Sequence, residues 1–166
     1  MPSRVDLSAF DCSVARTLDV VGDKWSLLVL RDAFYGVRRF EDFTRDLSIA
    51  RNVLSDRLGR LVNAGVLERR QYEQHPPRFE YRLTAKGRDL LPVLLTMMRW
   101  GDTWQAQDDD AAPMELVHTE CGRTTHAVAT CAECGQPLTP FNVRLQPLPP
   151  VIDEVVRRRQ AAAHSH

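Results

Sequence analysis

The chain has 166 residues, of which 43% are hydrophobic, and it carries 22 basic and 22 acidic side chains. The hydrophobic content is enough for a folded core, so the composition excludes a wholly disordered protein. No apolar run approaches the roughly 20 residues of a membrane-spanning helix, and residues 1–12 contain no apolar stretch long enough for a signal peptide. We therefore expect a soluble cytoplasmic protein without a membrane partner.

The zero net charge conceals an uneven distribution. Residues 38–88 hold 12 basic and 7 acidic side chains, whereas residues 106–166 hold 5 and 8. A basic segment in a neutral chain can still form a cationic face, and cationic faces attract phosphates. Genome composition alone would explain the preference for Arg over Lys, but it does not explain this clustering.

The first predicted element is a helical stretch over residues 13–35, interrupted at Gly22 and Asp23. Asp23 is a favourable N-cap for the second half of this stretch, and Gly36 is a favourable end. The second half is mostly apolar, which predicts a helix at the centre of the core.

Two short amphipathic helices follow, over residues 38–47 and 51–64. Their apolar residues recur at helical spacing, so each helix buries one face. The apolar positions are Phe40, Phe43, Leu47, Leu54, Leu58, Leu61 and Val62. Two short helices with so short a connection predict a helix-turn-helix.

The hydrophobic period changes after Gly65 to the alternation of strands. Residues 66–72 and 79–83 read as the two strands of a β-hairpin, and residues 73–78, with their two prolines, read as the turn. A hairpin directly after a helix-turn-helix makes a winged helix. The predicted fold class is therefore mainly α with a β-hairpin wing, followed by a small C-terminal β module that resembles a zinc ribbon.

Thr84 precedes a long helix that we expect to continue to residue 105, with Pro92 kinking it or lying near a break. Its apolar residues form two stripes. One stripe includes Val93 and Met97, and the other includes Leu91 and Leu95. A helix on one small core needs one stripe, so the second predicts a homodimer. Deep burial of the helix within its own domain is the alternative.

Composition predicts the domain organisation. Residues 1–105 form the helix-turn-helix and dimerisation domain, and the acidic, proline-containing residues 106–113 form a linker. Residues 114–150 form the small β module around three cysteines, and residues 151–166 form a tail.

The solvent side of the 51–64 helix predicts DNA binding. Side chains near the start of a recognition helix reach base edges in the major groove, where Arg suits guanine and Asn suits adenine. The predicted groove contacts are Arg51, Asn52, Ser55 and Arg60. Asp56 lies on the same side and would repel phosphate, so it either reads a cytosine amino group or pairs with Arg60.

Basic residues around the hairpin suit the DNA backbone. The predicted phosphate contacts are Arg38, Arg39, Arg69, Arg78 and Arg82. A polar helix face is common on any protein, however, and winged helices also serve as protein-interaction modules. A winged-helix interaction module without DNA binding is therefore the alternative function.

Residues 12–104 resemble the HxlR branch of winged-helix bacterial regulators, which is related to the MarR family. The resemblance rests on the runs LDVVGDKWSLLVLRD, RRFEDF, IARNVLSDRL, LVNAGVLERR and PPRFEYRLTAKGRDLLPVL. It implies a homodimeric transcription factor, usually a repressor, that binds a pseudo-palindromic operator. It also implies that residues 51–64 are the recognition helix and residues 66–83 the wing. Ala50 departs from the polar cap residue of many members.

The sequence suggests two candidate regulatory signals, a redox signal and a small-molecule effector, and leaves an alternative open for each. The resemblance makes Cys12 a candidate redox sensor, although a small residue packing the first helix is the alternative. A small-molecule effector could bind a cavity between the dimer helices, lined by Trp25, Trp100 or Trp104, although tryptophans at helical spacing more often belong to a core.

The sequences HTECG (118–122) and CAECG (131–135) are near copies, each with two metal-ligand residues and then a glycine. The candidate ligands are His118, Cys121, Cys131 and Cys134, with His126 as a weaker fifth. Their spacing favours a structural zinc ion, with a Cys131–Cys134 disulfide or free thiols as alternatives. Four protein ligands would leave no open position for catalysis, so we do not expect an enzyme.

Overall fold

The computed structural model describes residues 7, 10–105, 114–144, 146 and 152. The chain divides into two compact units, Met1–Ala127 and Val128–His166. This division places the first part of the predicted 114–150 module in the first unit. The predicted linker, and the predicted tail apart from Ile152, lie outside the described residues.

The first two helices are α1 (Ser13–Val21) and α2 (Lys24–Phe34). As the sequence predicts, Asp23 caps α2: its Oδ1 accepts hydrogen bonds from the backbone N–H groups of Trp25 and Ser26, at 3.1 and 3.0 Å. Val29 and Leu30 of α2 are fully buried, so this helix does lie at the centre of the core.

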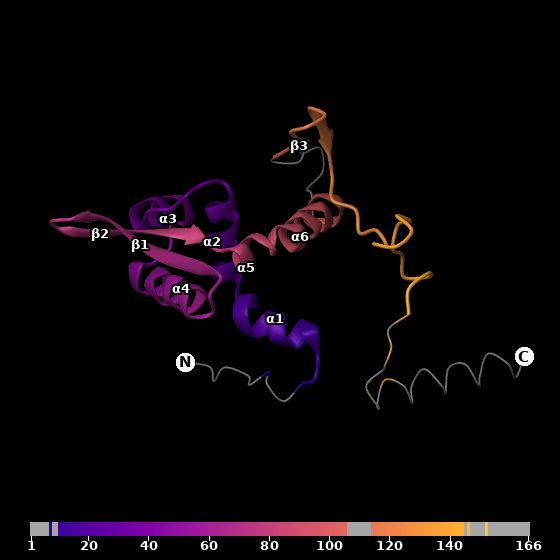
Figure 1. The fold of residues 1–166 in the computed structure, drawn as a ribbon, viewed down its shortest axis with the longest axis horizontal. Helices are drawn as coiled ribbons and strands as arrows, with labels where there is room; N and C mark the ends of the chain where they lie inside the picture. The colour runs from indigo at the N-terminus through magenta and orange to yellow at the C-terminus, as the bar shows by residue number, and fades with distance from the viewer. Residues whose placement is uncertain (1–6, 8–9, 106–113, 145, 147–151, 153–166) are drawn as a thin grey trace, which may run out of the picture. The chain divides into compact units, whose positions relative to one another are not determined.

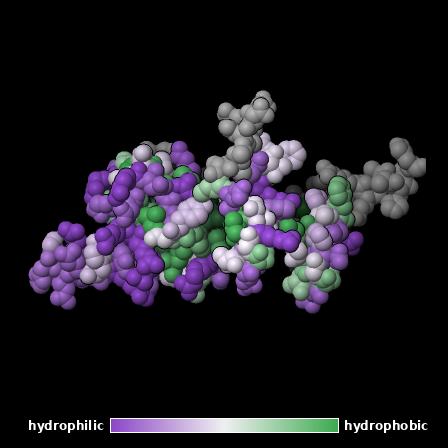
Figure 2. Space-filling model, turned by 90° about the horizontal axis from the view of Figure 1, so that it is seen from above, coloured by the Kyte–Doolittle hydropathy of each residue, from purple (hydrophilic) through white to green (hydrophobic). Residues whose placement is uncertain are grey.

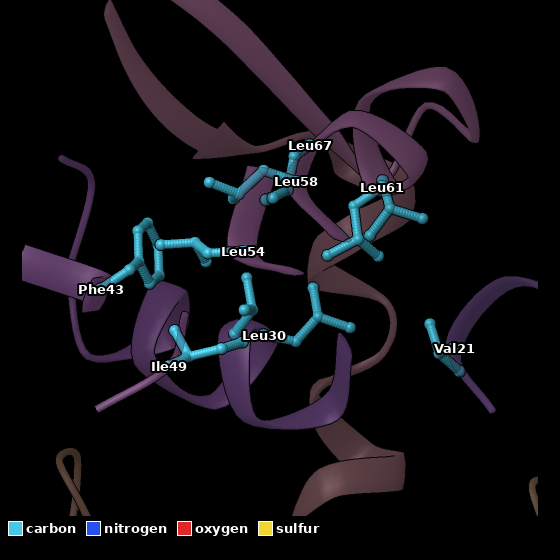
Figure 3. Packing of buried hydrophobic residues seen from close by; sticks show 10 residues of the cluster. Val21, Leu30, Phe43, Ile49, Leu54, Leu58, Leu61 and Leu67 are labelled. Atoms are coloured by element: carbon cyan, nitrogen blue, oxygen red, sulfur yellow. The ribbon is translucent and has the colours of Figure 1, made fainter. Parts of the chain in front are cut away.

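The helix-turn-helix consists of α3 (Phe40–Leu47) and α4 (Arg51–Asn63). Ser48 closes α3 in the left-handed conformation (φ 47°), and the buried Ile49 follows it. Leu54, Leu58 and Leu61 of α4 are fully buried. In Figure 3 these side chains face Leu30 of α2, which confirms the predicted buried face of the 51–64 helix.

The wing is an antiparallel hairpin of β1 (Leu67–Gln74) and β2 (Pro77–Leu83). Its strands are longer than the sequence predicts, because Glu73 pairs with Arg78 and Gln74 with Pro77. The predicted six-residue turn is therefore wrong, and only His75 and Pro76 connect the strands. Proline is tolerated as the first residue of a strand. In Figure 1 the hairpin extends beyond α3 and α4.

A break divides the predicted final helix into α5 (Ala85–Arg88) and α6 (Leu91–Trp104). Pro92 lies in the first turn of α6, where its missing N–H costs no hydrogen bond. The expected break near Pro92 is thus present, but the prediction of one continuous helix from residue 85 to residue 105 is wrong. Thr84 caps α5 by accepting a hydrogen bond from the Gly87 N–H. A Cβ on Gly87 would lie 2.2 Å from the Val66 carbonyl oxygen, so this contact requires glycine.

The core of the first unit lies where α2, α3, α4 and the base of the wing meet (Figure 3). Beyond α6, the first unit contains a short antiparallel hairpin of β3 (Leu116–His118) and β4 (Arg123–Thr125). In the second unit, Thr130 and Pro137 form an isolated β-bridge. The predicted winged-helix class is confirmed, whereas the resemblance of the C-terminal part to a zinc ribbon stays a prediction.

Candidate nucleic-acid interface

The candidate interface begins with the exposed side of α4. The predicted groove residues Arg51, Asn52, Ser55 and Arg60 are all exposed, opposite the buried leucines. Ala50 makes no side-chain cap, as expected, so the first N–H groups of α4 have no such partner. The helix therefore presents polar side chains and a weakly capped N-terminus to solvent.

Asp56 is held by arginines of its own helix. Arg60 Nε lies 3.0 Å from Asp56 Oδ2, and Arg57 Nη1 lies 3.3 Å from the same oxygen. Of the two roles predicted for Asp56, pairing with Arg60 is the one present. This ion pair offsets the repulsion that a lone carboxylate would exert on phosphate.

Sequence reasoning missed Arg57. Its side chain is only 22% exposed, and its Nε lies 3.1 Å from Oδ1 of Asp23, the residue that caps α2. The Arg57 side chain therefore links α4, the candidate recognition helix, to α2, the central helix of the core. The sequence signals that could have indicated this pair are an arginine on the flank of α4 and Asp23, the acidic N-cap of α2, which lies far away in the sequence.

Arg51 is positioned by α3. Its guanidinium lies 4.8 Å from the centre of the Phe40 ring and 3.6 Å from the Glu41 carboxylate. Both partners belong to the first turn of α3. Arg51 is thus held at the junction of the two helices while it remains exposed.

The wing arginines form pairs along the hairpin. Arg70 Nε lies 2.8 Å from Glu68, Arg78 Nε lies 3.2 Å from Glu73, and Arg82 Nε lies 2.6 Å from Glu80. Arg69 instead stacks on Phe79, with its guanidinium 3.5 Å from the ring centre. Arg82 is only partly exposed, unlike the other predicted contact residues.

The residues before α3 attach to the wing. The Tyr81 N–H donates to the Arg38 carbonyl at 2.8 Å, and Arg39 forms a β-bridge with Glu80. The Arg39 guanidinium lies 4.9 Å from the Tyr72 ring centre. Tyr72, which sequence reasoning also missed, is the extra residue where the hairpin register shifts between Gln71 and Glu73.

These side chains surround a hollow of about 490 Å³ between α3 and the wing. Its lining includes Glu41, Arg69, Tyr72, Arg78 and Phe79. Figure 2 shows predominantly hydrophilic residues over the protruding end of the wing. The first unit therefore brings α4, the wing and residues 38–39 into one polar, arginine-rich region.

The predicted metal ligands form two local pairs. His118 Nδ1 lies 3.3 Å from Cys121 Sγ in the first unit. In the second unit, the backbone N–H groups of Cys134 and then Glu133 hydrogen-bond the Cys131 sulfur and lower the pKa of that thiol, and the Cys134 side chain adds to the shift. Within the described parts of the chain, no three His, Cys, Asp or Glu side chains gather into a metal-binding group.

Cys12 is an exposed free thiol at the N-cap of α1. Of the predicted effector-site tryptophans, Trp25 packs partly against the core, whereas Trp100 and Trp104 are 59% and 70% exposed. Among the described residues, no helix combines the length and the apolar character that a membrane span requires.

A family model described as HxlR-like helix-turn-helix matches residues 20–109. The chain belongs to this HxlR-like family. The match spans all the elements of the candidate interface, from α2 through the wing, together with α5 and α6. The family resemblance in the sequence is thus confirmed.

Related proteins agree with this assignment. An HTH-type transcriptional regulator of Mycobacterium tuberculosis is 43% identical over 137 residues, which are 82% of this chain and 86% of the relative. The solved transcription-factor structure PA1607 is 38% identical, with a TM-score of 0.76 over 84% of this chain and 97% of the other. The redox regulator HypR, in its oxidized form, is 39% identical, with a TM-score of 0.53 over 58% and 99%. This HxlR-like chain is therefore a DNA-binding transcriptional regulator and not an enzyme.

Proposed function

We propose that this HxlR-like regulator is a homodimeric repressor that reads a two-fold DNA operator through α4. The exposed polar face of α4 opposite its three buried leucines carries this proposal. Arg51, Asn52 and Ser55 lie in the first turns of the helix, from which recognition helices reach base edges. Arg60 lies one to two turns further along the same helix.

The arginine ion pairs on this surface are compatible with DNA binding. Exposed ion pairs contribute about 0–1 kcal/mol each, so a phosphate can replace a carboxylate at small cost. Pairing also restrains the long side chains before DNA arrives. Arg69, Arg78 and Arg82 on the wing, and Arg38 and Arg39 beside it, are the proposed phosphate contacts.

The homodimer is proposed from two helices that leave apolar side chains exposed. In α1 and just before it, Phe10, Val14 and Leu18 are exposed. In α6 the exposed set includes Val93, Met97, Trp100 and Trp104. A second copy of the chain is the simplest partner, because a two-fold pair of recognition helices can then engage successive major grooves about 34–36 Å apart.

Repression would follow if the dimer occupies promoter DNA. Two signals could release it. Oxidation of the exposed Cys12 is one, in line with the presence of the redox regulator HypR among the related structures. A small molecule is the other, and a hollow of about 220 Å³ beside Leu95, Met98 and His126 in the first unit is a candidate site.

Genome-wide binding of the purified full-length protein to fragmented DNA tests the proposal. We expect enrichment of a pseudo-palindromic sequence, and loss of that enrichment when Arg51, Asn52 and Arg60 are all replaced by alanine. Arg88→Ala, which removes an exposed arginine on α5, is the matched control and should preserve enrichment. A folded dimer that enriches no sequence would instead favour the protein-interaction module.

A further inference from the structure

We propose that Arg57 is a positioning residue that releases Arg60 for DNA binding. By holding the Asp56 carboxylate, Arg57 allows the Arg60 guanidinium to leave that carboxylate and contact the operator. This role rests on the proposed function, since it requires that α4 contacts DNA. Three ion pairs that run from the N-cap of α2 across α4 carry it.

The Asp56 carboxylate is shared by two arginines at a single oxygen atom. Arg60 Nε lies 3.0 Å from Asp56 Oδ2, and Arg57 Nη1 lies 3.3 Å from the same oxygen. Two positive charges therefore face one negative charge. If Arg60 turns towards DNA, Arg57 remains beside the carboxylate and still neutralises it.

The two arginines differ in how firmly they are held. The Arg60 side chain is 45% exposed, whereas that of Arg57 is 22% exposed. Arg57 also has a second partner, because its Nε lies 3.1 Å from Asp23 Oδ1 on α2. Exposed ion pairs are weak, whereas separating a mostly buried charge from its partners is costly. Arg60 is therefore the arginine that can leave Asp56, and Arg57 is the one that stays.

Asp23 is itself fixed to α2, so it gives Arg57 a rigid attachment. Its Oδ1 accepts hydrogen bonds from the Trp25 and Ser26 N–H groups at 3.1 and 3.0 Å, and the Ser26 hydroxyl donates to its Oδ2. Ser26 is buried. The position of Arg57 is thus set by the core of the first unit and not by the exposed face of α4.

The same geometry explains how α4 can carry an acidic residue on its DNA-facing side. With Arg57 gone, the departure of Arg60 would leave Asp56 without either of these counter-charges. An unpaired carboxylate beside the groove would repel phosphate. Arg57 therefore acts on DNA binding through Asp56 and Arg60, without a DNA contact of its own.

A double-mutant cycle on the full-length protein tests this role. Arg57→Gln should weaken binding to the enriched operator duplex about tenfold, a coupling typical of residues in one ion-pair network. In an Asp56→Asn background the same substitution should weaken binding by less than about twofold, as for independent sites. Fluorescence anisotropy measures the four affinities. Arg88→Gln, which removes an exposed arginine on α5, is the matched control for loss of charge and should leave the affinity unchanged.

The rescue by Asp56→Asn separates positioning from a purely structural role. Loss of the Asp23 contact is the same in both backgrounds, so an equal loss of affinity in both would overturn the proposal. No loss in either background would also overturn it. If Arg57→Gln does not fold by circular dichroism, Asp56→Asn alone decides. It should bind the operator at least as tightly as the unsubstituted protein, and clearly weaker binding would overturn the role.

Arg60→Ala distinguishes failure of this role from failure of the proposed function. If Arg60→Ala weakens operator binding and Arg57→Gln does not, α4 still contacts DNA and only the role of Arg57 is overturned. If Arg60→Ala, and the triple alanine variant of Arg51, Asn52 and Arg60, both bind the operator normally, the proposed function fails and this role fails with it.

Discussion

Arg57 Nε on α4 lies 3.1 Å from Oδ1 of Asp23, the carboxylate that caps α2. This ion pair lacks good hydrogen-bond alignment at Nε, so its contribution is mainly electrostatic. Both side chains are mostly buried, at 22% and 32% exposed. One carboxylate therefore both begins the central helix and positions the candidate recognition helix.

We predict that Asp23→Ala lowers the free energy of unfolding by about 1–2 kcal/mol, because it removes both the helix cap and the Arg57 partner. Asp23→Asn should cost less, since an amide oxygen can still cap α2. Chemical denaturation of both variants measures the difference. If the two variants lose the same free energy of unfolding, the helix cap makes no contribution beyond that of the Arg57 ion pair.

Asn52→Ala should weaken binding to the operator more than binding to unrelated DNA. Loss of one good base contact costs about 1–3 kcal/mol of discrimination. Fluorescence anisotropy with an operator duplex and a scrambled duplex gives both affinities. A uniform loss on both duplexes would assign Asn52 to the backbone instead.

Arg78→Ala should weaken binding to both duplexes alike, because a wing arginine meets phosphate and carries no sequence information. The slope of log affinity against log salt should become shallower by about 1, in line with one fewer phosphate contact. Titrations at several salt concentrations measure this slope. An unchanged slope would remove Arg78 from the interface.

Met97→Glu together with Trp100→Glu should convert the dimer to a monomer and abolish operator binding, because the charges would be desolvated in an apolar interface. Sedimentation velocity gives the oligomeric state, and circular dichroism checks folding. Tyr35→Glu, at an exposed aromatic residue on the C-cap of α2, is the matched control and should stay dimeric. A monomeric unsubstituted protein would refute the dimer.

The buried Asp32 predicts a pH dependence of stability. Burial raises its pKa above the ordinary value near 3.8, although its hydrogen bond from Arg31 opposes the shift. The folded state therefore binds this proton more tightly than the unfolded state. As a result, the contribution of Asp32 to the free energy of unfolding falls as the pH rises from 3.8 through the pKa of the folded state.

Asp32→Asn removes this titration. The free energy of unfolding of the variant, relative to the unsubstituted protein, should therefore increase across the same pH window and then level off. Urea denaturation at a series of pH values measures it. Parallel profiles for the two proteins would contradict a raised pKa at Asp32.

The sequence by itself determined the elements that depend on local chemistry. The spacing of Leu54, Leu58 and Leu61 defined the buried side of α4, and Asp23 marked the start of α2, because helical period and capping act within a few residues. The exposed positions of Arg51 and Asn52 followed from the same period. The polar and basic residues on this face and around the wing predicted DNA binding, and the family motifs agreed with that prediction.

Only the tertiary structure decided how distant residues meet. The Arg57–Asp23 pair, and Tyr72 beneath Arg39, each join residues far apart in sequence, so no local pattern predicts them. The bulge at Tyr72 and the short turn at His75–Pro76 depend on strand register. These contacts arise from non-local pairing, whose free energy depends on the assembled fold and not on neighbouring residues.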